Sequence, residues 1–521
     1  MNAMRYAVWT TLAMVLGFGP IPGRAAEGQP PPAAADRPYT VVDTGQDRCY
    51  GERGEIAWPG PGEPFFGQDA QVVTAAPAYR DNGDGTVTDR VTGLEWQKDP
   101  GAKKTFRQAV AGASACRTGG HDDWRLPTIK ELYSLILFSG ADPDPRGSGT
   151  DRLRPFIDAD AFVFHYGDAE RGERIIDSQF ATCTKYVSTT MHGDETMFGV
   201  NFADGRIKGY GLRDPRGRGE KTFYVLYVRG NPAYGRNDFR EGGDGTVIDR
   251  ATGLEWMRAD SGHLKAGPKG DGRLTWQEAL AWAEELTYAG HDDWRLPSAK
   301  ELQSLVDYTR SPDTMQSAAI DPVFRVTPIR NEGGRPDFPW YWTGTTHASP
   351  RGGSTAVYVA FGRSLGWMRD RRTGEYALLD VHGAGSQRSD PKAGDASWYP
   401  HGRGPQGDVI RIRNFARCVR GGGAALRTTA PASYHPVAET PPAAGAGPPE
   451  GGPEGEGPMG PSGEQFVRRL DRDGDGKVSR KEFDGPAWDF GRLDRSGDGY
   501  LSAEEAPRGP PPQRQGPPPR R

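Results

Sequence analysis

Several features that usually narrow the function of a protein are scarce in this sequence of 521 residues. Its formal net charge is only −4, so no overall basic field favours nucleic-acid binding. Its four cysteines are far apart in the sequence, which disfavours a cysteine metal site. It contains no His-Glu-x-x-His motif and no phosphate-binding loop. The sequence therefore offers no catalytic constellation, and we do not expect an enzyme.

Long apolar runs are absent after the beginning of the chain, which argues against a membrane span in a mature form. At the beginning, Arg5 precedes the apolar run Ala7–Gly19, and small residues follow. This order is typical of a secretory signal peptide, predicted at 1–26 with cleavage after Ala25 or Ala26. An uncleaved anchor is the alternative. With cleavage, the protein is expected to be periplasmic or secreted.

The cysteine count suggests disulfides in such an oxidising compartment, and four cysteines allow three pairings. Pairing within one domain favours Cys116–Cys183. That leaves Cys49–Cys418 to tie the N-terminal segment to a late strand. We predict these two disulfides.

The most informative feature of the sequence is an internal duplication. The string HDDWRLP occurs at His121–Pro127 and again at His291–Pro297. Gly-Asp-Gly-Thr-Val, followed by Thr-Gly-Leu-Glu-Trp, precedes it both times. A repeat of this kind indicates two copies of one domain. We place the first copy at 39–230 and the second copy at 231–421.

Within each copy, two helix signals come first and strand signals follow. Each helix is predicted to begin at a capping box, in which a hydroxyl and a longer polar side chain satisfy opposite amide groups. The boxes are Thr105 with Gln108, Thr128 with Glu131, Thr275 with Glu278, and Ser298 with Glu301. The predicted strands include Tyr186–Thr190, Phe198–Phe202, Phe223–Arg229, Tyr341–Thr346, Val357–Phe361 and Ile410–Arg420. Two early helices followed by antiparallel strands indicate an α+β class.

The residues of the repeated HDDWRLP string are expected to be structural. Trp124 and Trp294 each precede a capped helix, so we predict that they pack beneath it in the core. Arg125 and Arg295 are expected to pair with a carboxylate or with strand carbonyls. Metal binding by His121–Asp123 is the less favoured alternative, because contiguous side chains in a turn seldom aim at one point.

The Gly-Asp-Gly turns and one histidine are weaker candidates for function. Asp84 and Gly85 resemble the centre of a calcium loop, but Arg80 and Val91 would occupy its first and last ligand positions. A tight turn is therefore favoured, and the second copy fails the same test. His382 is the most suggestive single residue for catalysis, although a structural loop histidine is the favoured interpretation.

At this level of detail the two copies resemble a known family. GDGTV, TGLEW, DDWRLP with KEL, and a terminal CVRG resemble the Legionella collagen-like protein (Lcl) C-terminal domain family, over roughly 40–421 in tandem. That family is similar to C-type-lectin-like folds, so the resemblance implies two tandem C-type-lectin-like domains. It also implies an extracytoplasmic binding role, with sulfated glycans as the ligand class. The chain departs from the family in lacking a long collagen-like region and a basic net charge. A related fold houses the formylglycine-generating enzyme, whose late cysteine pair is missing because only Cys418 lies late.

The segments 471–482 and 494–505 each match a twelve-residue EF-hand calcium loop. Such a loop supplies oxygen ligands from positions 1, 3, 5, 7, 9 and 12, with glycine at position 6. The predicted ligands are Asp471, Asp473, Asp475, Lys477 through its carbonyl, Glu482, Asp494, Ser496, Asp498, Tyr500 through its carbonyl, and Glu505. Val478 and Leu501 are expected to pair across the two loops. We predict a small all-α EF-hand module that binds Ca²⁺ and loses stability without it, because its carboxylates repel.

The other segments are predicted to be connections. We expect a disordered segment at 27–38, a Gly/Pro/Ala linker at 422–463, the EF-hand pair at 464–506 and a disordered tail at 507–521. The predicted function is that of an exported calcium-binding protein whose tandem domains bind a glycan or an envelope ligand. Two alternatives stay open: an enzyme of the lectin-like fold class, and a structural envelope protein with a calcium-stabilised tail.

Overall fold

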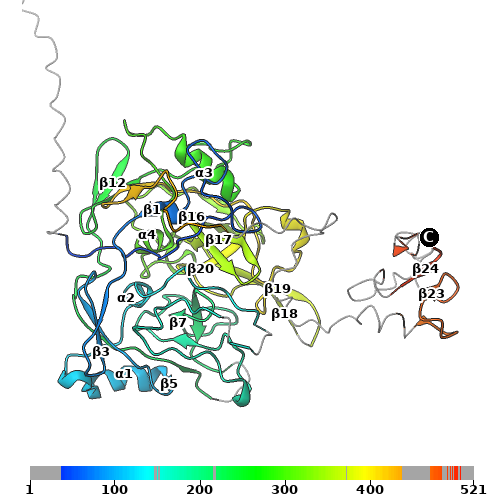
Figure 1. Ribbon diagram of the computed structural model, residues 1–521, viewed down its shortest axis with the longest axis horizontal. Coiled ribbons are helices and arrows are strands. Elements are labelled where there is room, and N and C mark those ends of the chain that lie inside the picture. Colours follow the sequence, from blue (N-terminus) through cyan, green and yellow to red (C-terminus); the bar gives the residue numbers. More distant parts are fainter. Residues whose placement is uncertain are drawn as a thin grey trace, which may run out of the picture.

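The computed structural model describes residues 37–145, 149–150, 153–214, 219–370 and 372–436, together with parts of the C-terminal module (Figure 1). Within the module the described residues are 467, 470–483, 490, 493–494, 496, 498–502 and 505. The predicted signal peptide, the tail and most of the two predicted connections lie outside the described residues. No helix in the described part of the chain has the length and apolarity needed to cross a membrane.

Each copy contains the same four-stranded antiparallel sheet, as the duplication predicts. In the first copy it comprises β2 (Tyr79–Asp81), β3 (Thr86–Asp89), β4 (Leu94–Gln97) and β10 (Val228–Gly230). In the second copy it comprises β11 (Phe239–Glu241), β12 (Thr246–Asp249), β13 (Leu254–Met257) and β21 (Val419–Gly421). The Gly-Asp-Gly segment forms the first hairpin turn of each sheet, where Asp84 and Asp244 accept hydrogen bonds from the threonine two residues later. The prediction of tight turns is confirmed.

Four of the five helices among the described residues begin at the predicted capping boxes, and both hydrogen bonds of each box are present. The helices are α1 (Phe106–Ala115), α2 (Ile129–Tyr133), α3 (Trp276–Glu284), α4 (Ala299–Ser304) and α5 (Pro312–Met315). All are short, with four to ten residues. The 3₁₀ segments are η2 (Asp69–Gln71), η3 (Thr118–Gly120), η4 (Ala169–Arg171) and η5 (Ala396–Trp398).

Both tryptophans of the repeated HDDWRLP string are buried, as predicted, but each belongs to the hydrophobic cluster of the preceding helix, α1 or α3, and not to that of the helix that follows. Trp124 and Trp294 are buried, with 4% and 3% of their surface exposed. The arginine that follows each tryptophan forms an ion pair with the N3 glutamate of the next helix. These pairs, Arg125–Glu131 and Arg295–Glu301, both have N–O distances of 2.7 Å.

A central six-stranded sheet joins the two copies, in the order β16, β17, β20, β8, β7, β6. The second copy supplies β16 (Trp340–Ser349), β17 (Gly352–Ala360) and β20 (Gln387–Pro391), and the first copy supplies β8 (Arg206–Gly211), β7 (Thr196–Asn201) and β6 (Gln179–Phe180). The copies meet where Gln387 of β20 pairs antiparallel with Ile207 of β8. Figure 1 shows β7, β20 and β17 passing through the middle of the molecule.

The contact between the copies is reciprocal. The Lys130 ammonium on α2 donates to the Ser304 carbonyl at 2.7 Å, and the equivalent Lys300 on α4 donates to the Ser134 carbonyl at 2.8 Å. Burial lowers the pKa of both lysines to about 8. Because equivalent residues exchange equivalent contacts, the two halves pack as the subunits of a two-fold symmetric dimer do.

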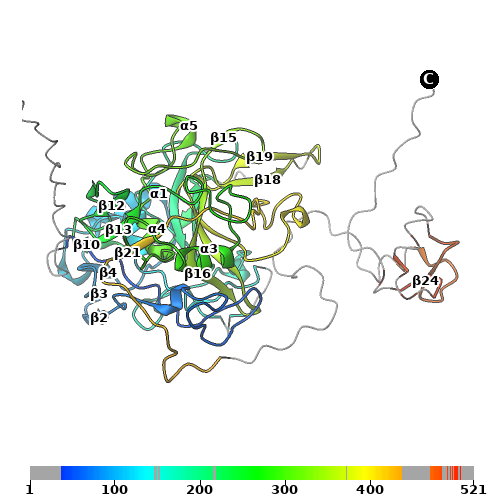
Figure 2. The same ribbon diagram turned by 90° about the horizontal axis from the view of Figure 1, so that it is seen from above.

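The N-terminal segment packs mainly on the second copy. Gln46 donates to the Thr346 carbonyl at 2.7 Å, and the buried Asp69 carboxylate accepts from the Thr345 hydroxyl at 2.5 Å. Short ladders complete the fold: β1 (Val72–Val73) with β22 (Ala425–Leu426), β5 (Lys104–Thr105) with β9 (Thr222–Phe223), β14 (Ile329–Arg330) with β15 (Pro336–Asp337), and β18 (Leu365–Arg369) with β19 (Tyr376–Asp380). Figure 2 shows β18 and β19 projecting from the body of the molecule.

The prediction of an α+β class with two C-type-lectin-like domains and an all-α module is wrong. Most of the regular elements among the described residues are β-strands in several small antiparallel sheets, and the helices are short. Capping boxes locate the start of a helix but not its length, so four capping boxes do not by themselves imply a large helical content. In the C-terminal module, Val467, Leu470, Phe490 and Leu493 are helical, but β23 (Val478–Ser479) pairs with β24 (Tyr500–Leu501), so the module is not all-α.

Three predicted strands also differ from the structure. The predicted strand Phe223–Arg229 is divided between β9 and β10, and residues 224–227 lie outside the named strands. The other two predicted strands are largely irregular segments. Tyr186–Thr190 lies outside the named strands, and Lys185 and Thr190 contribute only isolated bridges. In Ile410–Arg420, regular pairing begins only at Val419, because Ile412 has a φ of 55° that removes it from the extended region. Both segments are β-prone in composition, but their backbones turn within the segment.

The two predicted disulfides are also wrong, because all four cysteines are free thiols. Cys116 follows α1 and its sulfur accepts a hydrogen bond from the Gln97 amide at 3.2 Å. Cys183 is exposed, and its backbone amide donates to the Pro127 carbonyl. Cys49 and Cys418 are both buried, and burial raises the pKa of the Cys49 thiol to about 12.

Candidate functional sites

The first predicted calcium loop brings its carboxylates together. Oxygen atoms of Asp471, Asp473 and Asp475 lie within 4.8 Å of one another. A backbone hydrogen bond from Asp475 lowers the pKa of Asp473, but desolvation and the charges of Asp475, Glu482 and Asp471 outweigh it and raise that pKa. This donor set fits Ca²⁺, which prefers several carboxylate and carbonyl oxygens and would relieve the repulsion.

The glutamate at position 12 folds back into each loop. Glu482 accepts hydrogen bonds from the backbone amides of Arg472 at 2.8 Å and Ser479 at 2.8 Å. Glu505 accepts from the backbone amides of Ser496 at 2.9 Å and Ser502 at 3.0 Å. Hydrogen bonds from these serines lower the pKa of both glutamates to about 2, so both are ionised at neutral pH. The two predicted ligands therefore hold equivalent positions in the twin loops.

The two loops are joined as predicted. Val478 pairs with Leu501 in the β23–β24 ladder, and both side chains are fully buried. The small core also contains Val467, Leu470 and Phe490, with Phe483 and Leu493 packed against it. The predicted core residues Phe466 and Trp488 lie outside the described residues.

Hydrogen bonds also connect other predicted ligands of the second loop. Asp494 accepts from the Gly499 amide at 3.0 Å, and Ser496 donates to Asp494 at 3.4 Å. Lys477 of the first loop was predicted to bind calcium through its backbone carbonyl. Its side-chain ammonium forms an ion pair with Asp498 of the second loop at 3.1 Å. Tyr500 lies in β24 with its side chain partly exposed.

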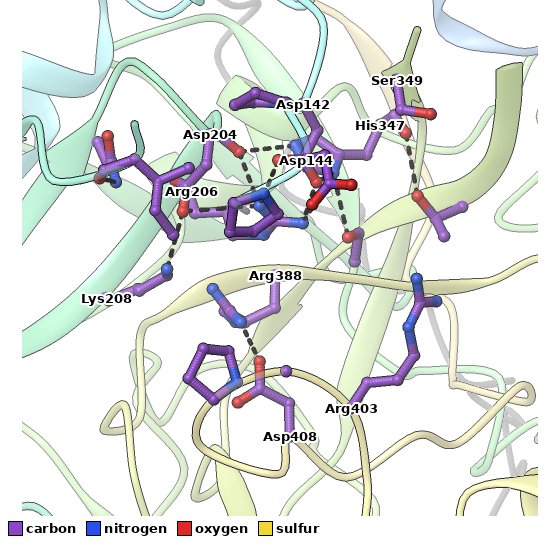
Figure 3. Close-up of a pocket in the computed structure, with 18 of the residues that line it drawn as sticks. Asp142, Asp144, Asp204, Arg206, Lys208, His347, Ser349, Arg388, Arg403 and Asp408 are labelled. Atoms are coloured by element: carbon purple, nitrogen blue, oxygen red, sulfur yellow. Dashed lines mark hydrogen bonds and ion pairs between the residues drawn. The ribbon is translucent and has the colours of Figure 1, made fainter. Parts of the chain in front are cut away.

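A second site, which the sequence did not reveal, is a pocket of about 380 Å³ between the two copies. The first copy contributes Asp142, Arg174, Asp204, Arg206, Lys208, Tyr210 and Lys221, and the second contributes His347, Ser349, Arg351, Arg388, Arg403 and Asp408, among others. Figure 3 shows Lys208 and Arg403 on opposite sides of the pocket, with Arg388 between them. The pocket therefore exists only because the two copies pack together.

The strands that form the central sheet deliver these side chains. Arg206, Lys208 and Tyr210 alternate along β8, so all three lie on one face of the sheet, while Ile207 faces the core. Arg388 comes from β20, the neighbouring strand. The alternation of charged and apolar residues in β8 is the sequence signal that could have indicated this wall.

Ion pairs connect several of the lining residues. Arg206 contacts Asp142 at 2.6 Å, and Lys208 contacts Asp204 at 2.9 Å. Arg388 pairs with Asp408. Burial of Lys208 lowers its pKa to about 8.

His347 is an uncharged part of the pocket wall. Its Nε2 lies 2.9 Å from the Asp204 carbonyl and its Nδ1 lies 3.1 Å from the Ser389 hydroxyl. Burial and the charge of Arg206 hold the pKa of His347 well below its usual value. The histidine therefore stays neutral and fixes the neighbouring loop rather than adding charge.

His382, the candidate for catalysis, is placed behind this wall. Its Nε2 contacts the Asp408 carboxylate at 2.8 Å, and only 1% of its surface is exposed. Burial lowers the pKa of His382 to about 4. This geometry suits a neutral histidine that orients Asp408, in agreement with a structural role.

The acidic residues of HDDWRLP are likewise engaged with arginines. Asp123 pairs with Arg229 and Asp293 pairs with Arg420, each at 2.6 Å. His121 lies 3.4 Å from Glu95. These contacts tie the string to the four-stranded sheet and do not gather the side chains around a common point.

Comparison with known proteins identifies the tandem region. The model of the Lcl C-terminal domain matches residues 85–229 and again residues 245–379. No curated protein and no solved structure matches the chain. The two matches cover more than half of the 521 residues and correspond to the two copies found from the repeated strings. The chain therefore belongs to the Lcl C-terminal domain family, which it carries twice in tandem.

Proposed function

We propose that this chain is an exported calcium-binding protein whose tandem Lcl C-terminal domains bind a glycan or another envelope ligand. The observation that carries the calcium part is the pair of loops, each closed by its glutamate and joined through Val478 and Leu501. Calcium bound in each loop would neutralise the crowded carboxylates and stabilise the ladder between them. We expect dissociation constants of about 10⁻⁵ to 10⁻³ M, the range between sensor sites and extracellular modules.

Calorimetric titration of the chain without residues 1–26 tests the calcium sites. The wild-type protein should bind two calcium ions, and the Asp471→Ala/Asp494→Ala variant should bind none. The matched control is Asp84→Ala/Asp244→Ala, which removes the same number of carboxylates from the Gly-Asp-Gly turns. Calcium binding that survives in the first variant and disappears in the control would place the metal in the tandem domains and refute the proposal.

Membership of the Lcl C-terminal domain family supports the ligand-binding part. A glycan array with the fluorescently labelled protein, in calcium and in EDTA, measures it directly. Binding to a defined set of glycans supports the proposal, and the EDTA arm shows whether calcium is needed. A protein that binds calcium but no glycan or envelope polysaccharide would instead be a structural envelope component.

A further inference from the structure

The pocket between the copies has an excess of positive charge. Its lining contains seven lysine or arginine side chains and four carboxylates. The cations are Arg174, Arg206, Lys208, Lys221, Arg351, Arg388 and Arg403, and the carboxylates are Asp142, Asp144, Asp204 and Asp408. Four of the cations pair with these carboxylates, and Arg174 pairs with Asp177 outside the lining.

Lys221 and Arg403 are the cations left over. No carboxylate in the described part of the chain forms an ion pair with either side chain, and the charged end of each lies over aromatic rings. The Lys221 ammonium lies 4.7 Å from the centre of the Tyr210 ring, and the Arg403 guanidinium lies 6.0 Å from that of Tyr399. Burial lowers the pKa of Lys221 to about 8 and that of Arg403 from its ordinary value. Cations in such surroundings are costly to keep charged unless an anion joins them.

Arg388, the buried arginine of β20, also lacks hydrogen-bond acceptors. Arg388 is 8% exposed and donates to Asp408 through one nitrogen. Its Nε and Nη1 atoms are buried without a hydrogen-bond partner among the described residues. Buried polar groups are nearly always satisfied in native proteins, so this wall of the pocket holds more donors than acceptors.

The dimensions and remaining chemistry of the pocket suit a small molecule. Its volume of about 380 Å³ lies in the range of ligand pockets, roughly 300–1,000 Å³. Hydroxyl and amide side chains such as Ser349, Thr355 and Gln179 line it beside Ile176 and Ile410. These groups can bind polar substituents and a carbon skeleton, while the cations bind a charge.

We propose that the pocket between the two copies binds a small organic anion, to which Lys221 of the first copy and Arg403 of the second copy each offer a cationic contact. The anion carries a carboxylate, sulfate or phosphate, because these groups accept several charge-assisted hydrogen bonds. The site is independent of the calcium loops. It is also independent of whether the tandem domains bind an extended glycan on another face.

Calorimetry on the chain without residues 1–26 at low ionic strength tests this proposal with four probes: glucuronate, glucose 6-phosphate, citrate and uncharged glucose. The anionic probes should bind and glucose should not. Binding of glucuronate and glucose 6-phosphate, but not citrate, identifies an anionic sugar as the ligand class. Binding of citrate as well identifies organic acids in general. Absence of binding by all three anions, or equal binding of glucose, overturns the proposal.

Three matched variants locate the site. Lys221→Met and Arg403→Met should each weaken anion binding by about tenfold or more, because each removes a charge-assisted contact. Lys269→Met, which removes an exposed lysine outside the pocket, should leave the affinity unchanged. If the two pocket variants behave like this control, the proposal fails.

Thermal unfolding without ligand separates this role from a structural one. Because Lys221 and Arg403 lack a carboxylate partner, Lys221→Met and Arg403→Met should be at least as stable as the wild type. A cation that merely held the fold together would lower the melting temperature when replaced. The Asp471→Ala/Asp494→Ala variant should keep its anion binding, so failure of the calcium proposal and failure of the anion proposal give different results.

Discussion

Replacing Glu301 by Gln should destabilise the protein much more than replacing Glu131 by Gln, although the two glutamates have the same role in the capping boxes that follow the duplicated string. Each accepts a hydrogen bond from the backbone amide of its cap residue at 2.8 Å, and each pairs with an arginine at 2.7 Å. The difference lies in the arginine that remains. The Arg295 side chain is 8% exposed, whereas the Arg125 side chain is 35% exposed and can turn to water.

The magnitude follows from this exposure. Breaking a buried pair costs about 3–5 kcal/mol because an uncompensated charge remains, whereas an exposed pair contributes about 0.2–1 kcal/mol. We therefore expect Glu301→Gln to lower the free energy of unfolding by about 3 kcal/mol and Glu131→Gln by about 1 kcal/mol or less. The pKa of Glu301 agrees in direction: burial opposes ionisation of this carboxyl, but the charge of Arg295 outweighs burial and lowers the pKa.

Urea unfolding followed by tryptophan fluorescence measures both variants, with the slope checked for equality before the midpoints are compared. The double variant Arg295→Met/Glu301→Gln should recover part of the loss, because it removes the orphaned charge. Equal losses in the two single variants would refute the argument that the exposure of the surviving arginine sets the cost.

Two further predictions concern the contact between the copies and the central sheet. Lys130 and Lys300 have a pKa of about 8 when folded and about 10.4 when unfolded, so between these values the unfolded chain binds more protons and stability should rise with pH. The rise in stability is roughly 1.4 kcal/mol per unit of pKa difference for each lysine. Thermal melts across pH 7–10 should show a smaller rise in the variant Lys130→Met/Lys300→Met. A fall in the stability of the wild type over this pH range would contradict the prediction. Gly199→Ala should destabilise the protein by about 1–3 kcal/mol, because its Cβ would meet the Phe180 carbonyl at 2.6 Å. Gly60→Ala, where the nearest atom is 3.6 Å away, is the control in the same denaturation assay.

Local features of the structure were predictable from the sequence. The four capping boxes depend on residues three apart, and each formed as expected. The pairing of Val478 with Leu501 follows from their common position in two similar loops. Trp124 and Trp294 are buried as predicted, although they pack with the preceding helices α1 and α3. In all these cases the partners are close in sequence or related by the repeat.

Features that depend on distant partners were not predictable in this way. The pocket combines Asp142, Arg206 and Arg403, and nothing in their sequence context shows that β8 and β20 become neighbours. The cysteine pairing failed for the same reason, because assigning Cys116 to Cys183 required knowledge of where each thiol lies. The fold class failed because the many short ladders, such as β5 with β9, are too brief to give a periodic signal.

The reciprocal lysine contacts have a consequence for how this molecule can evolve. In a dimer of identical chains, every substitution appears twice, and any groove between the subunits receives each new side chain from both sides. Fusion of the copies into one polypeptide fixes one pocket per chain and frees each half to change alone. Lys130 and Lys300 are equivalent residues that make equivalent contacts. Lys221 and Arg403, by contrast, line the pocket from different halves and are not equivalent positions of the repeat. The duplicated backbone thus stays symmetric, while the side chains that line the pocket can differ between the two halves. Such a pocket can bind an asymmetric ligand in a single orientation.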